Sequence, residues 1–73
     1  DNGIDAQRRV LEIAASHWVS IQHALSAKRL LSPKEVGILK IAAQMPSKIP
    51  TEKQCAVLLD TLEKARGEGI PVP

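Results

Sequence analysis

The chain has 73 residues, of which 44% are hydrophobic and 25% charged, and its formal net charge is +2. These values indicate one small globular domain and exclude a disordered chain. Trp18 is the only aromatic residue, which disfavours the base-stacking class of nucleic-acid binders because that class needs several exposed rings. Cys55 is the only cysteine, which excludes an internal disulfide and a cysteine-based zinc site, and a lone thiol suggests the reducing cytoplasm.

The N-terminal third of the chain predicts one long helix over residues 5–28. Apolar residues recur there at helical spacing, and no glycine or proline interrupts residues 4–31. Asn2 and Asp5 are the candidate N-caps. Trp18 lies on the apolar stripe, so we expect it to anchor the core, with a hot spot for a partner protein as the alternative.

A capping box predicts the second helix, over residues 33–45. Ser32 is followed three residues later by Glu35, and Pro33 occupies the first helical position. Pro46 then ends the helix.

A second capping box, from Thr51 to Gln54, predicts the third helix over residues 52–66, followed by a tail over 67–73. The small residues Gly37 and Ala56 stand at equivalent positions of the two capped helices and could let them approach closely. The expected fold is all-α: a small three-helix bundle forming a single domain over residues 1–73, without strands. We expect it to be a piece of a larger protein, from one end of that chain.

Positive charge is concentrated in the middle of the chain. Residues 28–53 carry six basic and two acidic side chains, a local charge of +4, whereas the rest of the chain carries −2. The basic residues gather at the interhelix connections and at two helix N-termini, where phosphates bind by charge and by backbone N–H groups. The candidate nucleic-acid-binding residues are Lys28, Arg29, Lys34, Lys48, Lys53 and Gln54. An ordinary solvated surface is the alternative, and in an up-down-up bundle the two connections would lie at opposite ends and split this group.

The second and third predicted helices also suggest a helix-turn-helix, with Lys53, Gln54 and Val57 facing a groove. The connection between them carries two prolines and is longer than the usual turn. Asp60 and Glu63 would in addition bring negative charge to phosphates. Both features count against this alternative.

Catalytic and metal-binding motifs are missing from the sequence. His17 and His23 are six residues apart and do not share a helix face, and Cys55 lies on an apolar stripe with no base beside it. No nucleotide-binding or hydrolase motif occurs. No apolar run is long enough to cross a bilayer, and there is no signal peptide. We therefore expect no enzyme activity, no cofactor, no metal, no small-molecule ligand and no membrane partner.

Three sequence segments carry a resemblance to known proteins: residues 31–35 (LSPKE), 50–54 (PTEKQ) and 58–65 (LLDTLEKA). With the preceding Trp18 helix, this layout resembles the C-terminal helical tails of abortive-infection phage-resistance (AIPR) proteins and of some mobile-element replication proteins. The match covers about two thirds of the chain, and capping boxes make up most of it. The resemblance implies a nucleic-acid-associated parent protein in a bacterial cytoplasm, and it transfers no catalytic residue.

Three functional hypotheses remain open. The first is a non-catalytic accessory module of a nucleic-acid-processing protein that contacts phosphates weakly and without sequence preference. The second is a docking module whose apolar groove takes a helix of a partner protein. The third is a structural bundle that packs on the remainder of its own parent protein.

Overall fold

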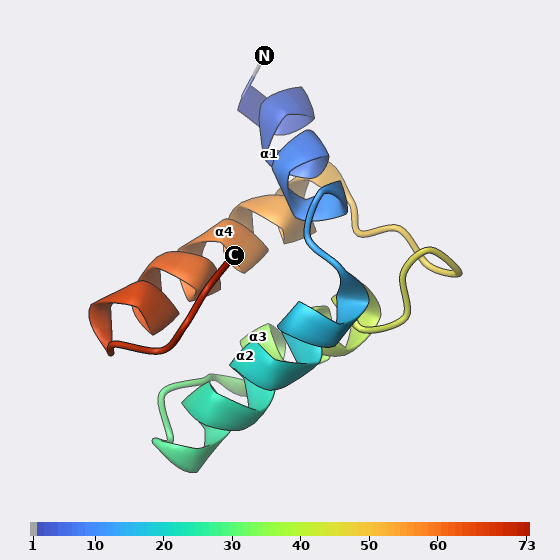
Figure 1. The fold of residues 1–73 in the computed structure, drawn as a ribbon. Helices are drawn as coiled ribbons and strands as arrows, with labels where there is room; N and C mark the ends of the chain where they lie inside the picture. Colours follow the sequence, from blue (N-terminus) through green and yellow to red (C-terminus); the bar gives the residue numbers. More distant parts are fainter. Residues whose placement is uncertain (1) are drawn as a thin grey trace.

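The computed structural model describes the backbone of residues 2–73 and the side chains of residues 4–73. Within this range the chain forms four helices, α1 (Asn2–Leu11), α2 (Ala15–Ala27), α3 (Pro33–Ala42) and α4 (Glu52–Gly67), and no strand (Figure 1). The all-α prediction is therefore confirmed, whereas the three-helix bundle is wrong. The Asn2 side chain, a predicted cap, lies outside the described residues. Nowhere in residues 2–73 is a helix both long and apolar enough to cross a membrane.

The predicted long helix is broken at Ala14, whose backbone is extended with φ −63° and ψ 147°. A straight helix over residues 5–28 would be about 36 Å long at a rise of 1.5 Å per residue. The longest dimension of the domain is only 31 Å. The break lets Val10 pack on α4 while Trp18 and Ile21 on α2 join the same core. The break agrees with this packing, and no glycine or proline marks it, since residues 4–31 contain neither.

Both predicted capping boxes are present. The Ser32 Oγ accepts a hydrogen bond from the Glu35 N–H at 3.2 Å, and the Ser32 N–H donates to the Glu35 carboxylate at 2.9 Å. Thr51 and Gln54 repeat this arrangement with the same two distances. The two helix starts are therefore confirmed, although α3 ends at Ala42, three residues before the predicted end, and residues 43–47 form turns.

The C-terminal tail folds back onto the end of α4. Gly69 has a φ of +75°, which a residue with a Cβ rarely adopts, and the Ile70 N–H donates to the Ala65 carbonyl at 3.0 Å. This Schellman motif turns the chain, so that Ile70 and Val72 pack against the core. The tail is therefore part of the folded domain.

One apolar core holds the four helices together. α4 contacts each of the other three helices, and α1 packs on α4 alone. Trp18 and Leu58 are among the largest side chains of the core, and both are fully buried. The Pro50 carbonyl accepts hydrogen bonds from Gln7 Nε2 at 3.1 Å and from Cys55 Sγ at 3.7 Å. These bonds join α1 and α4 to the segment between α3 and α4.

The predicted close approach through Gly37 and Ala56 is wrong. Both residues are exposed, and a Cβ added to Gly37 would meet no atom within 4 Å. The side chains that α3 and α4 bury in the core instead include Ile38, Leu39, Leu58 and Leu62.

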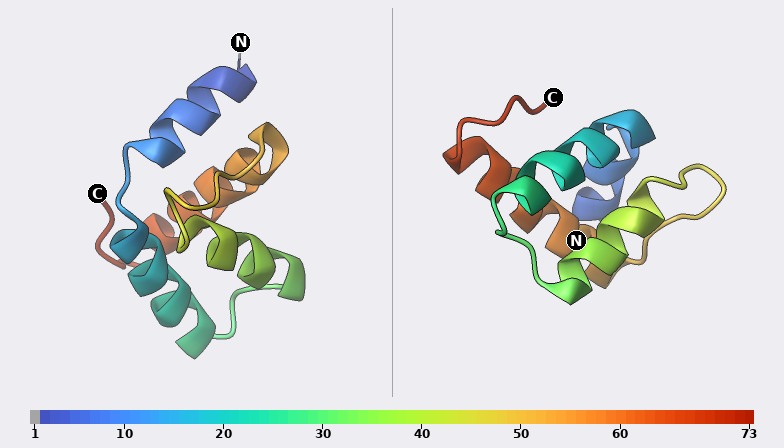
Figure 2. Two further views of the ribbon diagram at one scale, coloured as in Figure 1. Left: turned by 90° about the vertical axis from the view of Figure 1, so that its right-hand side faces the viewer. Right: turned by 90° about the horizontal axis from the view of Figure 1, so that it is seen from below.

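The direction of α4 decides which helix ends lie together on the surface of the domain. The segment 43–51 runs back from the end of α3, so that α3 and α4 both begin on the same side of the molecule (Figure 2). The two helices cross and do not lie side by side in an up-and-down bundle. As a result, the two capped N-termini share one edge of the domain.

Candidate nucleic-acid interface

Lys34 and Lys53 occupy matching positions, each as the second residue of a capped helix. Both are exposed. The two lysines therefore belong to helix starts that lie on the same side of the molecule (Figure 2). Helix N-termini carry partial positive charge, which adds to the charge of the ammonium groups.

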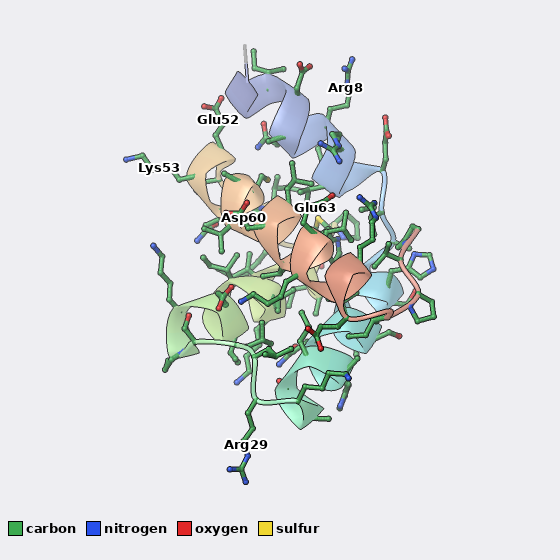
Figure 3. All side chains as sticks on the ribbon, turned by 90° about the vertical axis from the view of Figure 1, so that its left-hand side faces the viewer. Arg8, Arg29, Glu52, Lys53, Asp60 and Glu63 are labelled. Atoms are coloured by element: carbon green, nitrogen blue, oxygen red, sulfur yellow. The ribbon has the colours of Figure 1, made fainter. Side chains whose placement is uncertain are left out.

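Arg29 extends this edge past the start of α3. The Arg29 N–H donates to the Ser26 carbonyl and the Leu30 N–H to the Leu25 carbonyl, which is the Schellman ending of α2. Arg29 takes the position that glycine favours in this motif, with a φ of +57°. Figure 3 shows its side chain pointing into solvent at one end of the molecule, with Lys53 pointing away near the other end. We call Arg29, Lys34 and Lys53 the cationic edge.

The other three predicted contact residues are not part of the cationic edge. Lys28 forms an ion pair with Glu68 at 3.8 Å. The Gln54 side chain accepts the hydrogen bond of the second capping box and is half-buried. Lys48 is exposed in the segment 43–51, which projects on the side opposite the α2–α3 connection (Figure 1).

Basic side chains without a carboxylate partner are concentrated in one stretch of the chain. Within the described residues, four basic side chains have a carboxylate partner: Arg8, Lys28, Lys64 and Arg66. Six others show none within 4 Å there, and five of these fall between residues 29 and 53: Arg29, Lys34, Lys40, Lys48 and Lys53. In that same stretch Glu52 is the one carboxylate outside these pairs.

The exposed face of α4 carries three carboxylates beside the basic Lys53 and Arg66. Glu52, Asp60 and Glu63 are all exposed along this helix, and Figure 3 shows them on its outer surface. Val57, predicted to face a groove, is half-buried and packs against the core. An acidic helix entering a groove would meet phosphates of the same sign. The helix-turn-helix alternative is therefore unsupported by the geometry.

An interaction between α3 and α4 lies beside the cationic edge. Lys64 Nζ donates hydrogen bonds to both Glu35 carboxylate oxygens, at 3.2 and 3.0 Å, and to the Leu30 carbonyl at 2.9 Å. The backbone hydrogen bond from Ser32, with the Lys64 ammonium, lowers the pKa of Glu35 below its ordinary value. The cluster fixes the α2–α3 connection, and therefore Arg29, to α4. Sequence analysis missed it because the two residues are 29 positions apart.

The remaining candidate residues are structural. The Trp18 ring is fully buried, as expected for a core anchor, and no partner can reach it in this fold. Its indole Nε1 is buried without an acceptor in the described structure. Cys55 is also buried, and desolvation raises the pKa of its thiol.

An apolar pocket of about 180 Å³ lies beside the α1–α2 connection. Its lining residues are Leu11, Ile13, Ala14, Ala15, Met45 and Pro46. Leu11, on the rim of the pocket, is 49% exposed. The pocket contains no charged lining residue, so it suits an apolar side chain.

Comparisons with protein-family models, curated proteins and solved structures found no match for this chain. The resemblance to the tails of phage-resistance and replication proteins therefore stays a prediction, and function has to be argued from the geometry above.

Proposed function

We propose that this domain is a non-catalytic accessory module that contacts nucleic-acid phosphates through its cationic edge. We place it in the bacterial cytoplasm, as part of a larger nucleic-acid-processing protein. The observation that carries the proposal is that Arg29, Lys34 and Lys53 of the edge are all exposed and have no carboxylate partner within 4 Å in the described structure. Such contacts bind weakly and without base sequence preference.

Neutralisation of the edge tests the proposal. We expect binding of the 73-residue domain to labelled nucleic acid to weaken steeply as salt rises, with a log–log slope of about −0.9 for each phosphate neutralised on duplex DNA. Lys34→Gln and Lys53→Gln should each make that slope shallower by about 1.

Arg9→Gln is the matched control, because Arg9 is exposed on α1, outside the edge, and the substitution removes the same charge. It should leave the slope unchanged. If Arg9→Gln weakens binding as much as Lys53→Gln does, the edge is not the contact surface. If the wild-type domain binds no nucleic acid at low salt, the proposal fails.

A second candidate function is docking of a partner protein, favoured by the apolar pocket beside the α1–α2 connection. Pockets of this kind take an apolar side chain of a partner helix. Leu11→Ser would remove exposed apolar surface from the pocket rim without opening the core. Loss of the interaction with the parent protein in Leu11→Ser, with nucleic-acid binding retained, would favour this candidate.

A further inference from the structure

Burial of Trp18 leaves the domain without an exposed Trp, Tyr or Phe ring on which bases could stack. Trp18 is the only aromatic residue of the chain, and it is fully buried in the core. Stacking on aromatic rings supplies much of the affinity of proteins that bind single strands. The cationic edge therefore has to work without that contribution.

Reading of bases in a groove is also missing from the edge. The helix that carries Lys53, α4, also presents Asp60 and Glu63 on its outer surface (Figure 3), so these carboxylates would repel the phosphates on either side of a groove. What remains is contact between phosphates and the charged groups of Arg29, Lys34 and Lys53. Affinity then depends on how many ordered phosphates the edge reaches at once.

A double helix offers the edge more ordered phosphates at once than a single strand does. Duplex DNA carries about one charge per 1.7 Å of axis, roughly twice the density of one strand, and its phosphates are already held in place. Arg29 and Lys53 are held on a rigid framework, the first by the α2–α3 connection and the second by a capped helix. A flexible strand would lose conformational entropy on being ordered against them. On the basis of the proposed function, we infer that the ligand of this edge is double-stranded nucleic acid.

The test compares strands of equal length and mixed sequence on the 73-residue domain: duplex DNA, duplex RNA and single-stranded DNA, each by fluorescence anisotropy at low salt. We expect one of the duplexes to bind roughly two- to tenfold more tightly than the single strand. The two duplex arms show whether B-form or A-form spacing suits the edge. Trp18 emission should stay unchanged on binding, because the ring is out of reach of bases.

Arg29→Lys is the matched variant, since it keeps the charge but removes the planar guanidinium that can stack on unpaired bases. Any loss of affinity in this variant should be larger for the single strand than for the duplexes, because paired bases offer no free face to the guanidinium. Single-strand binding that equals or exceeds duplex binding would overturn the inference and leave the proposed function standing, as would quenching of Trp18 by the single strand. Absence of binding to all three ligands would overturn the proposed function itself.

Discussion

Arg29 combines backbone strain with an exposed side chain. Its φ of +57° lies in the left-handed region, which is unfavourable by about 1–2 kcal/mol for a residue with a Cβ. Glycine would end α2 without this strain. The arginine contributes nothing visible to the packing of the described chain, which agrees with a role for its side chain in binding.

Arg29→Gly should therefore stabilise the domain and weaken its binding. We expect the free energy of unfolding, measured by urea denaturation, to rise by about 1 kcal/mol. The salt slope for nucleic-acid binding should become shallower by about 1. Arg29→Ala is the control, because it loses the same charge but keeps the Cβ and therefore the strain. Equal stability of the glycine and alanine variants would show that the strain is absent.

At the scale of the helices, the features that depend only on neighbouring residues could be predicted from the sequence. Both capping boxes were found because Ser32 with Glu35, and Thr51 with Gln54, satisfy backbone groups within one turn. The break at Ala14 was missed because it has no local signal and follows from how α1 and α2 share α4. The edge was only partly predicted, since it also depends on the path of the segment 43–51.

Ala14 provides a direct test of the break. It is the N-cap of α2, but alanine has no side-chain acceptor for the free N–H groups of the first turn. Ala14→Ser should raise the free energy of unfolding by about 0.5–2 kcal/mol in urea denaturation. Ala24→Ser, in the middle of α2, should lower it slightly, because serine is a weaker helix former. A continuous helix through residue 14 would instead make both substitutions destabilising.

One substitution can remove the ion pair between Glu35 and Lys64 while keeping the capping hydrogen bond from the Ser32 N–H. Glu35→Gln keeps an acceptor for the Ser32 N–H, as Gln54 does for Thr51, but it removes the charge facing Lys64. We expect a loss of roughly 1 kcal/mol near neutral pH, since the pair is partly solvated. Thermal or urea unfolding of both proteins across a pH series measures this difference.

The pH dependence of that loss has a definite sign. Because the pKa of Glu35 is lower in the folded chain than its ordinary value of 4.5, the ion pair contributes fully above the unfolded value. The contribution declines as the pH falls through 4.5 towards the lower pKa of the folded state. The stability difference between wild type and Glu35→Gln should shrink over this interval. A difference that stays constant down to strongly acidic pH would contradict the ion pair.

For the whole molecule, the decisive feature is that one core serves all four helices. Trp18 on α2 and Cys55 on α4 belong to the same buried cluster, and each is fully buried. A domain of this size with a single core should unfold in one cooperative step. α1 is the one helix that could detach by losing a single helix–helix contact, because it packs on α4 alone.

The fluorescence of Trp18 and the chemical labelling of Cys55 can be compared in one urea titration. Trp18 emission follows the environment of α2, and a short pulse of thiol reagent follows access to Cys55, which lies beside the Pro50 carbonyl that also binds Gln7. We expect coincident midpoints, with Cys55 unreactive wherever Trp18 is native, because burial both shields the thiol and raises its pKa. A small free thiol labelled in the same urea solutions corrects for the reagent. Labelling of Cys55 before the Trp18 transition would mean that α1 detaches from α4 while the rest of the domain stays folded.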